Sequence, residues 1–241
     1  MRTRLLEFRA RHPVRSSAGA TYIAGGSGRQ CVLLLHDRVG GHESWFELIA
    51  LLEDSYRVIV PIQDRSSALA GILEAEGIRR VHVFGHGHGA LLAQAFVGGH
   101  PEYAASMMLA GTPARPFVVK GPLRLPGFLG KYAARRWASK LLSSEAPELG
   151  DEARSFWAGH FAEIGIQDPA SHPALVPLEA WTGRILLFES DRDGFVPESE
   201  AAQVRRSYPA AIVHRFDGAG HFAHLSRADS FALRIHLFCG S

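Results

Sequence analysis

Two residues of this sequence, His221 and Asp193, are candidates for acid–base chemistry near neutral pH. His221 lies in the segment GAGHFAHL and Asp193 lies in DRDGFVP, and a short apolar run precedes each segment. A histidine whose ring is held by a carboxylate can take a proton from a bound substrate or from water, without any covalent intermediate. The pair is therefore sufficient for several reactions, provided that the fold brings the two residues together.

A third feature is the segment Gly85–Gly89, which reads GHGHG. The apolar run VHVFG leads into it and the helix-forming run ALLAQAF follows it. A strand, a tight turn flanked by glycines and a helix form the nucleophile elbow, whose central residue normally attacks the substrate. The central residue here is Gly87, which has no side chain and cannot form an acyl- or alkyl-enzyme intermediate. Ordinary serine-esterase chemistry at this position is excluded.

The order of these segments, elbow, acid and then histidine, resembles that of the α/β-hydrolase superfamily. His36 ends the run CVLLLH where that family has a His-Gly pair, and HESWFELIALL is similar to the helix that follows. The resemblance covers essentially the whole chain. It implies catalytic roles for His221 and Asp193, with Gly87 at the nucleophile position and the nucleophile absent. The ending IHLFCGS and the short route out of YRVIVP also resemble maspardin-like members, which favours a binding role.

The residues after the run CVLLLH depart from the family pattern. Asp37 and Arg38 stand where a glycine and an apolar residue are common. The resemblance implies an oxyanion or substrate-binding region made by His36, Asp37, Arg38 and His88. The donors there would be the backbone N–H groups of Arg38 and His88, which survive a change of side chain.

The H-x-H spacing of His86 and His88 suggests a metal site, but zinc needs three or four convergent ligands and no third ligand follows in the sequence. We therefore expect no metal and no cofactor. Thirteen histidines are present in all, and most are expected to be structural. Among the others, His12 and His160 are expected in loops or at the surface.

Apolar runs alternate with helical patterns along the chain, which predicts an α/β fold with a mostly parallel sheet and helices on both faces. The predicted strands are 31–36, 56–61, 81–85, 107–110, 185–189 and 212–216, after a possible antiparallel edge formed by 5–9 and 21–24. The predicted helices are 43–52, 67–76, 90–98, 198–207 and 227–238.

Residues 115–181 break this alternation. They contain no convincing strand, but amphipathic stretches at 129–142 and 152–164 lie between several prolines. An insertion of this kind is typical of a helical cap over the carboxyl edge of a sheet, where open α/β sheets bind ligands. We therefore expect a core of residues 1–114 and 182–241, with a cap of residues 115–181 inserted after the sixth strand.

Composition limits the classes of partner. The chain has 241 residues and a net charge of +2, which predicts no electrostatic footprint on nucleic acid or on an anionic membrane. No apolar run is long enough to span a membrane, and the arginine-rich start lacks the apolar stretch of a secretory signal. Cys31 and Cys239 are expected to be free thiols in the cytoplasm, with a disulfide between them as the less favoured alternative. The expected assembly is a monomer or a small homo-oligomer.

Three functions remain open. The first is an enzyme that acts on a small carbonyl, ester or lactone substrate by His221–Asp193 general-base chemistry, as a lyase, cyclase or C–C cleaving hydrolase. It predicts a His221–Asp193 hydrogen bond and open space above Gly87. The second is an inactive pseudo-hydrolase that binds a ligand or a protein, which predicts an occluded site or a misaligned pair. The third is a serine hydrolase whose nucleophile has been engineered to Gly87.

Overall fold

The computed structural model describes residues 1–62, 66–115, 121–122, 127–166, 178 and 181–240. Its centre is an eight-stranded sheet with the order β1-β2-β4-β3-β5-β6-β7-β8. The strands from β4 onward along this order pair in parallel, whereas β2 is antiparallel to both β1 and β4. The bounds are β1 Val14–Ser17, β2 Ala20–Gly25, β3 Gln30–Leu35, β4 Tyr56–Pro61, β5 Val81–His86, β6 Ala104–Ala110, β7 Arg184–Ser190 and β8 Ile212–Phe216.

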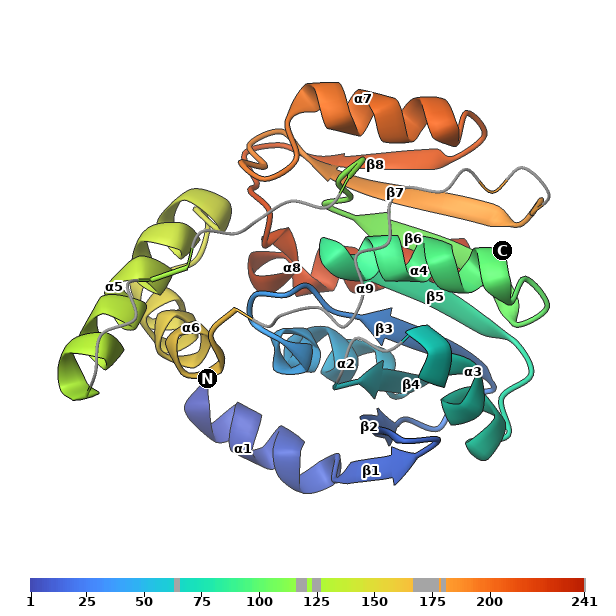
Figure 1. The fold of residues 1–241 in the computed structure, drawn as a ribbon, viewed down its shortest axis with the longest axis horizontal. Helices are drawn as coiled ribbons and strands as arrows, with labels where there is room; N and C mark the ends of the chain where they lie inside the picture. The colour runs from blue at the N-terminus through green and yellow to red at the C-terminus, as the bar shows by residue number, and fades with distance from the viewer. Residues whose placement is uncertain (63–65, 116–120, 123–126, 167–177, 179–180, 241) are drawn as a thin grey trace.

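Helices cover both faces of the sheet (Figure 1). The bounds are α1 Arg2–Arg11, the 3₁₀ turn η1 His42–Trp45, α2 Phe46–Leu52, α3 Ser66–Ala75, α4 His88–Gly99, α5 Gly127–Glu145, α6 Asp151–Ile164, α7 Glu198–Ser207, α8 Ala223–Ser226 and α9 Ala228–Cys239. The α/β-hydrolase fold class predicted from the sequence is therefore confirmed.

The strand side chains alternate between two apolar layers, as the two-residue period of a strand requires. In β3, Val32 and Leu34 pack into the layer that contains residues of α1, α2 and α9. Leu33 and Leu35 pack into the opposite layer, with residues of α3, α4 and α7. Burial of strands on both faces explains why the central strands read as continuous apolar runs.

The insertion between β6 and β7 contains the two helices α5 and α6, which lie beside the carboxyl ends of the parallel strands (Figure 1). Ala138 and Leu142 of α5 and Trp157 and Phe161 of α6 are buried in the first apolar layer. The cap is thus packed onto the body by apolar side chains. The domain boundaries at 115 and 181 remain a prediction.

One predicted strand is wrong. Residues 5–9 lie in the helix α1, because Leu5 and Phe8, spaced three apart, are the residues that it buries. The antiparallel edge is formed instead by β1 and β2, joined at Ala18 and Gly19 in left-handed conformations. His12 and His160 are also buried, contrary to expectation. Both cysteines are free and buried.

Candidate active site

The candidate site lies where four parallel strands end. Asp37 follows β3 by two residues, Gly87 follows β5, Asp193 follows β7 and His221 follows β8. The carboxyl ends of parallel strands meet at one edge of the sheet, so segments far apart in sequence deliver these residues to one place.

The turn at Gly87 has the strained geometry of a nucleophile elbow. Gly87 has φ 55° and ψ −119°, in a region that residues with a side chain rarely adopt. Its N–H donates to the carbonyl of Ala110 at 3.0 Å, and α4 begins at the next residue. The backbone thus keeps the shape that would present a nucleophile, although the side chain is absent.

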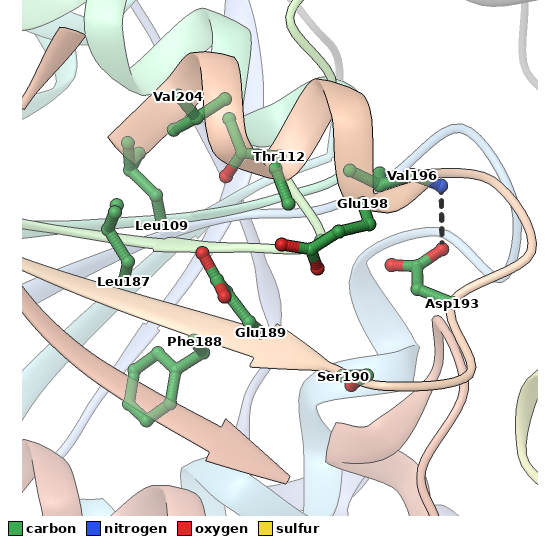
Figure 2. A pocket seen from close by; sticks show the side chains of 12 residues that line it. Leu109, Thr112, Leu187, Phe188, Glu189, Ser190, Asp193, Val196, Glu198 and Val204 are labelled. Atoms are coloured by element: carbon green, nitrogen blue, oxygen red, sulfur yellow. Dashed lines mark hydrogen bonds between the residues drawn. The ribbon is translucent and has the colours of Figure 1, made fainter. Parts of the chain in front are cut away.

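His221 and Asp193 form the predicted pair. His221 Nδ1 lies 2.9 Å from Asp193 Oδ2, and both side chains are almost completely buried. The other oxygen, Asp193 Oδ1, accepts the N–H groups of Phe195 and Val196 at 2.9 Å each; Figure 2 shows the bond from Val196. The acid is therefore fixed by its own turn, and it fixes the imidazole with Nδ1 toward Asp193.

A second carboxylate, that of Asp37, lies on the other side of His221. Asp37 Oδ1 accepts the backbone N–H of His88 at 2.8 Å, and Asp37 Oδ2 lies 3.6 Å from His221 Nε2. The Asp37 side chain is only 1% exposed. The His88 N–H is one of the two predicted oxyanion-hole donors, and in this structure it binds a carboxylate oxygen of the protein itself.

The Asp37 carboxylate fills the space above Gly87. A Cβ atom built on Gly87 would lie 2.4 Å from Asp37 Oδ1, closer than such atoms approach, and 3.0 Å from Asp37 Cβ, a crowded contact. The open space that the enzyme hypothesis predicted above Gly87 is therefore absent, because the carboxylate occupies the region of a nucleophile side chain. The predicted His221–Asp193 hydrogen bond is present.

Two carboxylates beside one imidazole favour its charged form. Burial lowers the pKa of His221, but the charges of Asp193 and Asp37 and the hydrogen bond to Asp193 outweigh burial and raise this pKa to about 10. Burial raises the pKa of Asp37, yet the contacts with His221 and the His88 N–H bring it well below its ordinary value. The pKa of Asp193 is lowered for the same reason. His221 is therefore an imidazolium between two carboxylates at neutral pH.

Two further buried imidazoles adjoin this cluster. His86 lies with its ring centre 4.6 Å from that of His221, and its Nε2 is 2.8 Å from the carbonyl oxygen of His221. Burial lowers the pKa of His86 to about 4, and burial also lowers the pKa of His224 well below its ordinary value. Both rings are neutral at pH 7, so the positive charge is confined to His221.

One set of donors could hold a metal ion. Asp37, His86 and His221 each offer one atom, and the three atoms lie within 4.8 Å of one another. This set differs from the predicted H-x-H pair, because His88 is not part of it. A cation there would compete with the proton that His221 carries between its carboxylates.

The comparisons with known proteins agree with this fold. The Alpha/beta hydrolase family matches residues 32–234. The chain belongs to the alpha/beta hydrolase family. A relative from Pseudomonas putida, 2-hydroxy-6-oxononadienedioate/2-hydroxy-6-oxononatrienedioate hydrolase 2, is 26% identical over 250 residues, which cover 86% of each chain. A second relative from the same organism, 2-hydroxymuconate semialdehyde hydrolase, is 24% identical over 185 residues, covering 70% of this chain and 65% of the relative.

Solved structures show the same fold. The meta-cleavage product hydrolase from Pseudomonas fluorescens is 22% identical, with a TM-score of 0.73 over 94% of this chain and 98% of that one. Naproxen esterase from Bacillus subtilis is 18% identical, with a TM-score of 0.68 over 99% and 96%. Both Pseudomonas putida relatives are hydrolases by name, which supports an enzyme. The likeness to maspardin-like members remains a prediction.

The remaining predicted residues lie around Asp37. His36 Nδ1 is 2.8 Å from the carbonyl oxygen of Asp37, and His88 is buried at the start of α4. Arg38 is half-buried in the loop that holds Asp37. The sequence order of the alpha/beta hydrolase motifs thus predicts which residues gather here, but not that the side chain of Asp37 would reach across to position 87.

Sequence analysis missed Glu145, the last residue of α5. Glu145 Oε2 accepts the N–H groups of Gly194 at 3.0 Å and His221 at 3.2 Å, and its backbone carbonyl accepts the N–H of Phe222 at 2.7 Å. The side chain is buried. One cap residue therefore joins the loop of the acid to the loop of the histidine. No local sequence motif predicts this role of Glu145, because its partners are 49 and 76 residues away.

A small cavity lies behind Asp193, between β7 and α7 (Figure 2). It has a volume of about 20 Å³, and Leu109, Leu187 and Val204 contribute to its wall. A space of this size holds about one water molecule and no organic substrate.

Proposed function

We propose that this chain is a hydrolase-like enzyme that acts on a small carbonyl-bearing acid through His221 and Asp193, with water in place of a serine nucleophile. The observation that carries the proposal is the position of the Asp37 carboxylate. Its Oδ1 accepts the His88 N–H at 2.8 Å and its Oδ2 lies 3.6 Å from His221 Nε2, so an anion bound in this place can face both groups. These are the two groups that must stabilise an oxyanion and deliver a proton during attack on a carbonyl.

The substrate class follows from the same two donors and from the relatives. The names of both Pseudomonas putida relatives describe hydroxylated dienoic acids that also carry an oxo or aldehyde group. A compound of this class has carbonyl and carboxylate oxygens that could replace those of Asp37. Its binding would move Asp37 away from His221 and leave the histidine with one carboxylate, that of Asp193.

In the proposed reaction, water attacks the substrate carbonyl and His221 transfers the proton. Without Asp37 beside it, His221 has a lower pKa and can lose its proton to the solvent. A water oxygen then bonds to the carbonyl carbon while His221 Nε2 takes a proton from that water. The resulting oxyanion accepts the His88 N–H. When the bond to the leaving group breaks, His221 returns the proton to it. In the resting state His221 is protonated, so the general-base role predicted from the sequence requires the displacement of Asp37.

A second candidate is a non-catalytic hydrolase homologue that binds a ligand or partner. The observation that favours it is that the Asp37 carboxylate occupies the site. Gly87 supplies no nucleophile, and the Asp37 and His221 side chains are 1% and 0% exposed. The third alternative, an engineered glycine, has less support, because a serine at position 87 would overlap Asp37 in its present position.

Turnover of 2-hydroxymuconate semialdehyde and of p-nitrophenyl acetate by matched variants tests these candidates. The enzyme proposal predicts turnover of the semialdehyde by the wild type, its loss in His221→Gln, and unchanged turnover in His100→Gln, a remote half-buried control. Asp37→Gly is expected to increase turnover. No turnover in the wild type or in Asp37→Gly, with all variants folded, would instead support the binding protein.

A further inference from the structure

The first part of the cap is strongly basic. Residues 115–144 contain seven of the 26 Lys and Arg residues of the chain and no Asp or Glu. The rest of the chain carries 19 Lys and Arg against 24 Asp and Glu. The small net charge of +2, which predicted no electrostatic footprint, therefore hides a separation of charge between one segment and the remainder.

The helix α5 presents part of this charge on an outward stripe. Phe128, Tyr132, Arg136 and Lys140 follow one another at four-residue spacing, which places them along one side of the helix. All four are exposed. The opposite side carries Ala138 and the other residues that pack the cap onto the body. In Figure 1, α5 lies at the outer side of the cap, with α6 between it and the body.

The apolar end of this stripe is unusual for a solvent-facing helix. Phe128 is 77% exposed, Tyr132 61% and the adjacent Leu129 52%. Large apolar and aromatic side chains gathered next to basic residues on one helix face are the pattern of helices that lie in the interface of a bilayer. Basic residues bind the anionic headgroups and the apolar residues enter the acyl boundary.

Beside the stripe lies an open hollow whose described walls include Arg135, Arg136, Lys140 and Trp137 and contain no acidic residue. Glu163 of α6 lies at a separate hollow, together with Lys131 and Arg135. Among the described residues, Arg136 and Lys140 have no recorded ion pair. Their charges are available to an external anion.

We propose that this face of α5, formed by Phe128, Leu129, Tyr132, Arg136 and Lys140, docks the protein reversibly on the surface of anionic phospholipid membranes. The contact is peripheral: within the described residues, no helix is long and apolar enough to cross a membrane. A nucleic acid would meet the same charges. The lipid surface is favoured because the exposed phenylalanine and leucine gain from an apolar boundary rather than from water.

Co-sedimentation with vesicles tests the proposal. The full chain is expected to bind vesicles of equal parts phosphatidylcholine and phosphatidylserine, not phosphatidylcholine alone, and to dissociate as salt rises. Arg136→Glu with Lys140→Glu should weaken binding by at least about tenfold, and Phe128→Ser with Tyr132→Ser should also weaken it. The charge-matched control, Arg79→Glu with Arg206→Glu, changes exposed residues outside α5 and should bind like the wild type.

Three results would overturn the proposal. They are equal binding to vesicles with and without phosphatidylserine, equal loss in the control variant, and binding to duplex DNA at the same salt concentration with no binding to either vesicle. Circular dichroism of each variant ensures that a loss of binding is not a loss of fold.

Discussion

The Asp37 carboxylate and the α-carbon of Gly87 are complementary: a Cβ at position 87 would lie 2.4 Å from Asp37 Oδ1. Gly87 and Asp37 both depart from the alpha/beta hydrolase pattern. Although they lie far apart in sequence, their positions in the structure are coupled, because the Asp37 side chain occupies the space that a side chain at position 87 would need. Removal of the nucleophile side chain makes room for an acidic side chain from the neighbouring strand end. That acid then binds the His88 N–H and approaches His221.

This complementarity predicts coupling between the two positions. Gly87→Ser is expected to lower the free energy of unfolding by about 1 to 3 kcal/mol, because the serine is crowded by Asp37 and its backbone is strained. In the Asp37→Gly background the same substitution should cost less. Denaturant unfolding of the two single variants and the double variant gives the coupling energy. Additive effects would show that the two residues do not compete for space.

The charged group formed by His221, Asp37 and Asp193 predicts how the free energy of unfolding changes above neutral pH. The stabilisation that His221 gains from its carboxylates is fully present below its unfolded pKa near 6.5 and is lost as pH rises through about 10. Asp37→Asn removes one of those charges, so we expect it to lower the free energy of unfolding by about 2 kcal/mol at pH 7. The difference between wild type and variant should shrink toward pH 10. A difference that is constant between pH 7 and pH 10 would contradict this account.

His224 predicts the behaviour at acid pH. Within the described chain, neither ring nitrogen of this buried residue has a hydrogen-bond partner, and its pKa is lowered. The unfolded chain takes up a proton there below about pH 6.5 while the folded chain does not, so stability falls as pH drops. His224→Phe should cost less than about 1.5 kcal/mol at pH 7 and lose less stability than the wild type between pH 7 and pH 5. A larger loss in the variant, measured by denaturant unfolding, would refute this.

Glu145 should behave as a structural clamp between the cap and the site. Glu145→Ala leaves the buried His221 N–H and the partly buried Gly194 N–H without their acceptor, which is expected to lower the free energy of unfolding by about 1 to 3 kcal/mol. Glu145→Gln keeps an acceptor oxygen and should retain most of the stability. The exposed Glu152→Ala in α6 is the control and should change stability by less than about 0.5 kcal/mol. Equal losses for the alanine and glutamine variants would show that charge matters rather than the acceptor.

Much of the fold was predictable because its signals are local. Apolar runs, with glycines at their boundaries, predicted the central strands and the helices of both layers. The helix α7 lies where it was predicted, at residues 198–207. Residues 5–9 were misassigned because a short apolar group suits either a strand or a helix, and only tertiary packing of Leu5 and Phe8 decides between them.

The site was predictable as a set of residues but not as an arrangement. Motif order predicted that His221, Asp193 and Gly87 would meet at the ends of neighbouring strands. It could not predict the contact of Asp37 with His88, which depends on the distance between two loops 51 residues apart. Nor could it predict the protonation of His221, since that depends on two carboxylates converging in a buried space.

The most direct test is an NMR titration of the His221 ring in the wild type and in Asp37→Asn. We expect the wild-type imidazolium to lose its proton near pH 10 and the variant to lose it at a distinctly lower pH, because one carboxylate charge is gone. A wild-type His221 that titrates near its ordinary pKa of about 6.5, with no change in the variant, would show that Asp37 does not hold this histidine in its charged form.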